Sequence, residues 1–160
     1  HYRRYMLNNN QKYVENILDN ENVVDKLKNV DILLCEHITF NSTLEEQIKN
    51  SIQPEAYDCG YNKVREALIK AHPEDVNVFD YVMGLHYFYP CNMFATTWSV
   101  FDEYCQWLFS FIIPAACNID VSGYNAYSKR VIGFFAERMM TVLVIKKKLK
   151  VEELPYITVE

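Results

Sequence analysis

Apolar residues recur at helical spacing in several parts of the chain. One helix is predicted over residues 11–28 and a second over residues 62–71. Pro73 disfavours helical geometry in His72 before it, so the second helix is expected to end there. The same proline suits the first turn of a third helix, predicted to run to Met83. The apolar positions of the first helix are Val14, Ile17, Leu18, Val24 and Leu27.

A capping box and three strand patterns divide these helices. In TLEE, residues 43–46, the side chains of Thr43 and Glu46 can each satisfy a free backbone amide at a helix start, which predicts a short helix to about Asn50. Strands are predicted where β-branched and aromatic residues gather or alternate. These segments are VDILL (30–34), NMFATTW (92–98) and VEELPYITVE (151–160).

The stretch SVFDEYCQWLFSFII, residues 99–113, has the pattern of an amphipathic helix with one core face. Ser99 is the expected N-cap. Asp102 and Glu103 would then lie in the first turn, where the helix dipole favours negative charge. Helix capping is therefore the structural interpretation of these two acids. The predicted core face consists of Phe101, Tyr104, Cys105, Leu108, Phe109 and Ile112.

A second long helix is predicted over VIGFFAERMMTVLVI, residues 131–145, which is apolar nearly all round and therefore expected to be buried. Its two charges are the neighbours Glu137 and Arg138. A buried charge without a partner costs several kcal/mol, so each must be paired or face a polar cavity. Two interpretations stay open: an ion pair that ties the helix to the sheet, or a carboxylate and a guanidinium at the wall of a pocket.

Composition narrows the class of protein. With 160 residues and 50% hydrophobic residues, the chain is expected to form one packed α/β domain over residues 1–160. A net charge of -5 argues against a surface built to bind nucleic acid. Five scattered cysteines without a C-x-x-C motif indicate neither a disulfide framework nor a zinc site, which fits a cytoplasmic setting. The apolar run at 107–117 is shorter than the ~20 residues of a membrane span.

Three blocks, in this order, carry a resemblance to a known family. They are HYRRY (1–5), NMFATTWSVFDEYCQWLF (92–109) and RVIGFFAERMMTVLVIKKKLKVEELP (130–155). Together they resemble the signature blocks of a bacterial family of capsular and exopolysaccharide glycosyltransferases, long known only as a domain of unknown function. The blocks span nearly the whole chain, and their joint occurrence is far more specific than any one alone. The resemblance implies the helix-rich, C-terminal portion of a nucleotide-diphospho-sugar transferase-like (GT-A-like) fold.

In this family HYRRY follows a strand near the middle of the protein. The resemblance therefore implies that the chain is the C-terminal part of such an enzyme and lacks its first nucleotide-binding strands. Ligands in open α/β sheets bind at the carboxyl ends of strands, and arginine forks suit diphosphates. On this view Arg3 and Arg4 hold the sugar nucleotide and His1 lies near its phosphates or a metal. Two solvated arginines are the alternative.

The resemblance also implies an activity: transfer of a hexose such as galactose from a UDP-sugar to a glycan or lipid-linked glycan of capsule, exopolysaccharide or O-antigen. Glu137 is the expected general base, with Arg138 orienting it or binding phosphate, and Asp102 is the rival base. The residues expected to contact sugar are Asn92, by hydrogen bonding, and Trp98 or the cluster HYFY (86–89), by stacking. In HYFY, a structural role for His86 and for the aromatic rings is the alternative.

Three questions stay open. The chain has no Asp-x-Asp motif, so a divalent metal, Mn²⁺ or Mg²⁺, would need ligands from elsewhere or from His1. The lysines at 146–148 and 150 are read as a solvated helix end, with peripheral contact to an anionic membrane face as the alternative. A non-catalytic remnant or protein-interaction module is the alternative to an enzyme.

Overall fold

A three-stranded sheet separates two layers of helix. The computed structural model describes residues 4–159. At the centre of the sheet, strand β2 (Ile32–Cys35) pairs in parallel with β6 (Val151–Leu154) and antiparallel with β5 (Phe94–Thr96). All four residues of β2 are buried, which confirms the strand predicted from VDILL.

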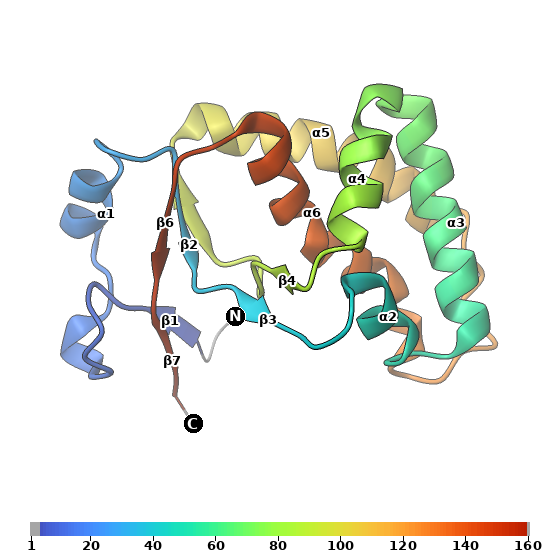
Figure 1. Cartoon of the computed structure of the whole chain (residues 1–160), viewed down its shortest axis with the longest axis horizontal. Coiled ribbons are helices and arrows are strands. Elements are labelled where there is room, and N and C mark those ends of the chain that lie inside the picture. Colours follow the sequence, from blue (N-terminus) through green and yellow to red (C-terminus); the bar gives the residue numbers. More distant parts are fainter. Residues whose placement is uncertain (1–3, 160) are drawn as a thin grey trace.

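Two short antiparallel pairs lie beyond the carboxyl end of β2 (Figure 1). Strand β7 (Tyr156–Thr158) continues from β6 and pairs with β1 (Arg4–Met6). Strand β3 (Ile38–Thr39) follows β2 and pairs with β4 (Tyr87–Phe88). Because β2 and β6 are parallel, both continuations leave the sheet at the same end. Segments far apart in sequence therefore meet there.

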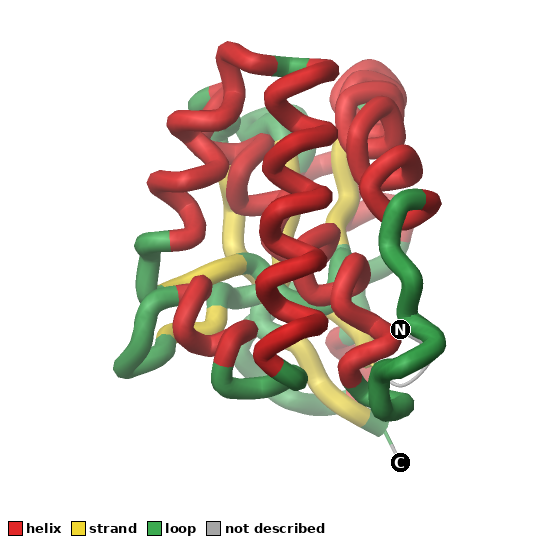
Figure 2. Tube along the Cα trace, turned by 90° about the vertical axis from the view of Figure 1, so that its right-hand side faces the viewer, coloured by secondary structure: helices red, strands yellow, loops and turns green. Residues whose placement is uncertain are grey.

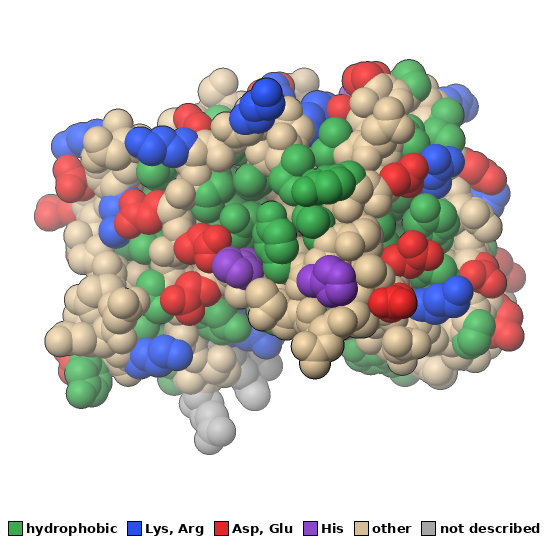
Figure 3. Space-filling view, in the orientation of Figure 1, with side chains coloured by type: hydrophobic (Ala, Val, Ile, Leu, Met, Phe, Trp, Pro, Cys, Tyr) green, Lys and Arg blue, Asp and Glu red, His purple; other side chains and the backbone are tan. Residues whose placement is uncertain are grey.

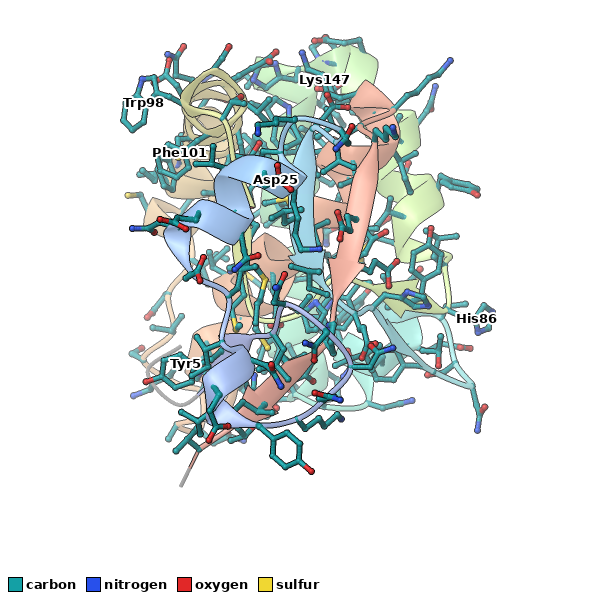
Figure 4. The ribbon with its side chains drawn as sticks, turned by 90° about the vertical axis from the view of Figure 1, so that its left-hand side faces the viewer. Tyr5, Asp25, His86, Trp98, Phe101 and Lys147 are labelled. Carbon is teal, nitrogen blue, oxygen red and sulfur yellow. The ribbon has the colours of Figure 1, made fainter. Side chains whose placement is uncertain are left out.

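Helices cover both faces of the sheet unequally. Helix α1 lies alone on one face (Figure 4), and the other α-helices pack on the opposite face (Figure 2). The α-helices are α1 (Asn20–Lys26), α2 (Leu44–Lys49), α3 (Pro54–Ala71), α4 (Val76–Met83), α5 (Trp98–Cys117) and α6 (Val131–Lys147). Short 3-10 turns occupy Val14–Asn16, Pro73–Asp75 and Ser128–Arg130. The fold is thus the predicted helix-rich α/β class.

Helix α6 is the centre of the helical layer and contacts α3, α4 and α5. It spans Val131–Lys147, as predicted, and the basic run begins in its last turn. Gly60 of α3 allows the two helices to approach closely. A Cβ atom at this position would lie 2.3 Å from Cγ2 of Val131 and 2.9 Å from Cε2 of Phe135. Helix packing therefore requires glycine there.

Local signals located several boundaries correctly. The capping box at Thr43 and Glu46 is present and begins α2. Helix α3 ends at Ala71, with His72 as its C-cap, as Pro73 predicted. It begins at Pro54 rather than at residue 62, because proline suits a first helical turn and the polar residues after it hid the apolar spacing. Helix α4 follows a 3-10 turn at Pro73–Asp75.

The predicted helix over 11–28 is wrong in its first half. Only Asn20–Lys26 is α-helical, and it begins there because Asp19 accepts a hydrogen bond from the Asn22 amide. The segment before it forms a short 3-10 turn and also bonds to the N-terminal strand region. The Leu18 amide donates to the Met6 carbonyl (2.9 Å), and the Asn8 amide donates to the Asn16 carbonyl (2.8 Å).

Helix α5 begins earlier than predicted. Its N-cap is Thr97, whose hydroxyl accepts from the Val100 amide, so Ser99 is not the cap. Asp102 and Glu103 therefore lie beyond the first turn, and their predicted capping role is wrong. The core face is also rotated: Phe101 and Phe109 are exposed, and the buried positions are Tyr104, Trp107, Leu108, Phe111, Ile112 and Ala115. Within residues 4–159, no helix is both long and apolar enough to span a bilayer.

Candidate functional site

A strained turn at Cys91 and Asn92 leads into β5 at the carboxyl end of β2. Both residues adopt left-handed backbone geometry, with φ of 72° for Cys91 and 49° for Asn92. Among the described non-glycine residues, only Lys148 shares a positive φ. Such geometry costs about 1–2 kcal/mol for a residue with a side chain and persists where the surroundings hold it.

Four side chains from three elements hold this turn. Hydrogen bonds reach it from α6, β2 and β1. They are the bonds from the Cys91 amide to Oε1 of Glu137 (2.8 Å), from the Tyr89 amide to Oγ1 of Thr141 (3.1 Å), from the Cys35 thiol to the Pro90 carbonyl (3.2 Å) and from Nη1 of Arg4 to Sγ of Cys91 (2.5 Å). The conformation of the turn therefore depends on residues distant in the sequence.

The thiol of Cys35 acts as a neutral donor beneath the turn. Burial, and next the neighbouring thiol of Cys91, raise the pKa of Cys35 to about 11. Its side chain is almost fully buried, with 1% of the residue exposed. At neutral pH it therefore keeps the proton that it donates to the Pro90 carbonyl.

Arg138 lies buried beside the turn, with 2% of the residue exposed. Its Nη1 donates to Oε2 of Glu137 (3.1 Å) and to the Phe134 carbonyl (3.0 Å), and its Nη2 donates to Oε1 of Gln47. The guanidinium also lies 4.2 Å from the ring centroid of Phe88. Burial lowers the pKa of Arg138, although the Glu137 carboxylate opposes this effect. The pair thus ties α6 to α2 and β4.

Glu137 also reaches away from its ion pair. One carboxylate oxygen accepts from Arg138 and the other accepts from the Cys91 amide. Its side chain is 29% exposed, whereas that of Arg138 is 2% exposed. The ion-pair interpretation is therefore confirmed for Arg138, and Glu137 joins that pair to the partly exposed turn. The placement of the two charges at the wall of a pocket stays a prediction.

A hollow of about 310 Å³ lies beside the turn, between β1 and β5. Arg4 supplies a cation to its wall and Asn92 supplies an amide. Such groups can bind an anion and sugar hydroxyls. The remaining lining residues are Tyr5, Met6, Ile17, Leu18, Met93 and Phe94. The structure thus brings Arg4 and Asn92 together, with Glu137 and Arg138 behind the turn.

Trp98 and Asp102 lie at the other end of the sheet. Thr96 is paired with Ile32, so the chain leaves β5 at the amino end of β2. In Figure 4, Trp98 and Tyr5 lie at opposite ends of the molecule. The Trp98 ring is 76% exposed, and the Asp102 carboxylate accepts a hydrogen bond from Nε2 of Gln106 (2.7 Å). His1 and Arg3 fall outside the described residues.

The HYFY segment divides between surface and core. Phe88 and Tyr89 are buried, and His86 is exposed and points away from the molecule (Figure 4). Tyr87 is half-buried beside His37. The structural interpretation is therefore correct for Phe88 and Tyr89, which pack in the core.

Sequence reasoning missed the pairing of His37 with Glu153. Nδ1 of His37 lies 2.8 Å from Oε2 of Glu153, and the Tyr89 hydroxyl donates to Oε1 of the same carboxylate (3.2 Å). Burial, with the Glu153 carboxylate as the next cause, raises the pKa of Tyr89, which therefore stays a donor. A histidine two residues after the buried strand VDILLC was the available signal.

A possible metal-ligand group lies elsewhere. Among residues 4–159, His72, Glu74 and Asp75 are the one set of three such side chains close enough to share an ion. However, Oδ2 of Asp75 accepts from Nε1 of Trp107 (2.8 Å) and from the ammonium of Lys146 (2.5 Å). An ammonium at this oxygen competes with a bound cation. These residues therefore do not fit a metal site.

Comparison with known proteins places the fold. The chain is similar to the apo structure of the WbbM bifunctional glycosyltransferase, with a TM-score of 0.83 and 25% sequence identity over all of this chain. The matched region is 32% of that protein, so this chain spans about a third of its length. No curated protein sequence matches at a significant level. A family model, the domain of unknown function DUF4422, matches residues 1–148, and the chain therefore belongs to this glycosyltransferase-related family.

Proposed function

We propose that the chain forms the C-terminal part of an enzyme that transfers a hexose from a nucleotide sugar to a glycan acceptor. One observation carries the proposal: Arg4, Asn92 and Glu137 converge on a strained turn at the carboxyl end of the sheet. Ligands of open α/β sheets bind at this end. The likeness to a glycosyltransferase supports the same chemistry.

The hollow between β1 and β5 would hold the donor, which we propose is a UDP-hexose such as UDP-galactose. Arg4 would bind the diphosphate, because a guanidinium fork matches two phosphate oxygens. Asn92 would hydrogen-bond a sugar hydroxyl. The side chains of His1 and Arg3 precede Arg4 in the same segment and would extend the phosphate site.

Glu137 is the proposed general base for transfer with inversion. Its carboxylate would take the proton of the acceptor hydroxyl as that oxygen forms a bond to the anomeric carbon. The bond from this carbon to the diphosphate breaks, and the electron pair leaves with the diphosphate, whose charge Arg4 offsets. Arg138 would orient the carboxylate. Each carboxylate oxygen accepts one hydrogen bond in the structure and keeps a further lone pair.

The proposed steps use only side chains of this chain. The described residues beside the hollow supply a cation, Arg4, and a single carboxylate near the turn, Glu137. Dependence on Mn²⁺ or Mg²⁺ therefore stays a prediction, and transfer measured in EDTA tests it. A capsular, exopolysaccharide or O-antigen product is also part of the proposal, as is a lipid-linked acceptor at the cytoplasmic face of the membrane.

A second candidate is a non-catalytic, protein-interaction module. It is favoured by exposed apolar side chains on α5, where Trp98 is 76% exposed, Phe109 is 49% exposed and Ile113 is 51% exposed. A surface of this kind can contact a further domain or a partner. The module would bind a partner through α5 and would not turn over sugar nucleotides.

A donor screen separates the two candidates. The complete product of the reading frame would be incubated with UDP-hexoses and a glycan acceptor, and release of UDP would be measured with and without the acceptor. The enzyme proposal predicts acceptor-dependent release that is lost in Arg4→Met. Release that Arg4→Met leaves unchanged would place the donor elsewhere, and no release from any UDP-hexose would favour the interaction module.

A further inference from the structure

A group of four polar and aromatic side chains lies at the carboxyl ends of β2 and β6. His37 follows β2, and Glu153 lies near the end of β6, where it is the register partner of Leu34. Tyr87 and Tyr89 reach the same place from β4 and the segment after it. We call His37, Tyr87, Tyr89 and Glu153 the Tyr87 cluster. It is separate from the Arg4 hollow but lies at the same end of the sheet (Figure 1).

The carboxylate of Glu153 fixes the polar members of the cluster. Its Oε2 lies 2.8 Å from Nδ1 of His37 and also accepts the His37 amide (3.3 Å), while its Oε1 accepts the Tyr89 hydroxyl (3.2 Å). A carboxylate at Nδ1 selects the tautomer with the proton on that nitrogen. Nε2 of His37 is then left as a hydrogen-bond acceptor.

The aromatic members contact one another edge to face. The ring centroids of His37 and Tyr87 are 5.3 Å apart at 66°, and those of Tyr87 and Tyr89 are 6.4 Å apart at 85°. These rings are therefore not stacked face to face. Figure 3 shows histidine side chains at the margin of a hydrophobic area on this side of the molecule, with acidic side chains beside this margin.

The ion pair of the cluster contributes little to stability. The side chain of His37 is 40% exposed and that of Glu153 is 32% exposed, and pairs in such positions add little to the stability of a fold. Tyr89 is buried, whereas Tyr87 is only half-buried. An oriented carboxylate and imidazole beside an aromatic ring therefore suggest recognition rather than core packing.

We propose that the Tyr87 cluster binds a neutral saccharide ring and, resting on the proposed function, is the acceptor subsite. The apolar C–H face of a pyranose would pack on the ring of Tyr87. Sugar hydroxyls would donate to Nε2 of His37 and to the Glu153 carboxylate. The negative charge of Glu153 disfavours the donor diphosphate here, so the ligand is an uncharged sugar.

Helix α6 holds this cluster and the Arg4 hollow in a fixed relation. Thr141 binds the Tyr89 amide, and Glu137, one helical turn before it, binds the Cys91 amide. Residues four apart lie on the same helix face. One face of α6 therefore fixes the backbone of Tyr89, a member of the cluster, and of Cys91, the neighbour of Asn92 in the wall of the hollow.

Binding of two probes, methyl β-galactopyranoside and methyl β-glucopyranoside, tests the subsite without any donor. Saturation-transfer NMR and titration on the complete reading-frame product would give the dissociation constants. We expect saturable binding of at least one glycoside, weakened about 3–10-fold by Tyr87→Leu, since an aromatic contact contributes about 0.5–1.5 kcal/mol. Glu153→Gln should weaken it similarly, and Tyr87→Phe, which keeps the ring, should bind within about twofold of the unmodified protein.

Trp98→Leu is the matched control, because it removes an exposed aromatic ring at the opposite end of the sheet and should leave binding unchanged. The melting temperature of each variant checks its fold, and Tyr87→Phe and Glu153→Gln decide the test if Tyr87→Leu does not fold. No saturable binding, or equal binding by all the variants, would overturn the proposal. Binding that depends on Tyr87 without turnover of any UDP-hexose would keep the saccharide site and reject the proposed function. Hexose transfer with an acceptor KM that Tyr87→Leu does not change would keep the proposed function and reject the acceptor subsite.

Discussion

The amide of Cys91 donates a hydrogen bond to Oε1 of Glu137 at 2.8 Å. This bond joins a turn with left-handed backbone geometry to a carboxylate of the buried helix α6. The other oxygen of that carboxylate is held by Arg138. Glu137, which the sequence singled out as a charge in an apolar helix, is thus in contact with the backbone of the candidate site.

Arg138→Met should destabilise the protein strongly. The change leaves the acceptors of Glu137, Gln47 and the Phe134 carbonyl without their donor, and breaking a buried pair costs about 3–5 kcal/mol. Because Glu137 is partly exposed, we expect the lower end, about 3 kcal/mol, in urea unfolding. The control Lys129→Met, at an exposed lysine near the same helix, should cost less than about 0.5 kcal/mol. Equal stability of the two variants would show that the pair is not structural.

Two substitutions at Asn92 distinguish the effect of backbone strain from that of the side-chain amide. Asn92→Ala should lower the free energy of unfolding by about 1 kcal/mol, because alanine resists left-handed geometry, and Asn92→Gly should change it little. If the Asn92 amide binds the donor, both variants should raise the donor KM to a similar extent. An unchanged donor KM in Asn92→Gly would show that donor binding depends on the backbone of the turn and not on the Asn92 amide.

Gly60→Ala should loosen the contact between α3 and α6. The added methyl group would overlap Val131 and Phe135, and overpacking of this kind costs about 1–3 kcal/mol. Gly133→Ala in α6 is the control, because nothing lies within 4 Å of a Cβ atom there. That change should raise stability by about 0.5 kcal/mol through helix propensity. Melting temperatures of the two variants that shift in the same direction would contradict this packing.

Stability should fall at alkaline pH through Cys35. The folded state holds the thiol proton up to a pKa of about 11, while an unfolded thiol loses it near pH ~8.5. Between these values the native state binds more protons than the unfolded state. The contribution of the thiol to stability is therefore complete below the unfolded pKa and is lost as the pH rises to the folded pKa. Cys35→Ser keeps a donor and removes the titration. Between pH 8.5 and 11, the free energy of unfolding of Cys35→Ser should fall by about 2–3 kcal/mol less than that of the unmodified protein. The same decrease with pH in both proteins would contradict this role of Cys35.

Local patterns were sufficient for elements whose stability is decided locally. The buried strand at VDILL, the capping box at Thr43 and the apolar helix α6 follow from neighbours within a few residues. The charge pair in α6 also stood out, because burial makes an unpaired charge costly. The segment before Asn20 was misassigned because the Leu18 amide and the Asn16 carbonyl bond to the N-terminal strand region, tertiary contacts that helical spacing cannot reveal.

The candidate site depended on contacts between distant residues. Cys91 and Glu137 are 46 positions apart, and His37 and Glu153 are 116 apart. The left-handed turn had only a weak local signal, Asn92, because asparagine tolerates this geometry but neither Cys91 nor its neighbours is glycine. Trp98, expected to stack on sugar, and Asp102, the rival base, were predicted to share a site with Asn92. The antiparallel direction of β5 carries them to the other end of the sheet.

The most direct test of the central claim is the rate of hexose transfer by Glu137→Gln, measured beside Asp102→Asn in the complete reading-frame product with saturating UDP-hexose and acceptor. Glutamine keeps an oxygen for the Cys91 amide but cannot take a proton, so kcat should fall about 100-fold or more while the donor KM stays near its original value. Asp102→Asn, at the far end of the sheet, should retain its rate. A full rate in Glu137→Gln, or a comparable loss in Asp102→Asn, would contradict the assignment of the site to the Cys91 turn.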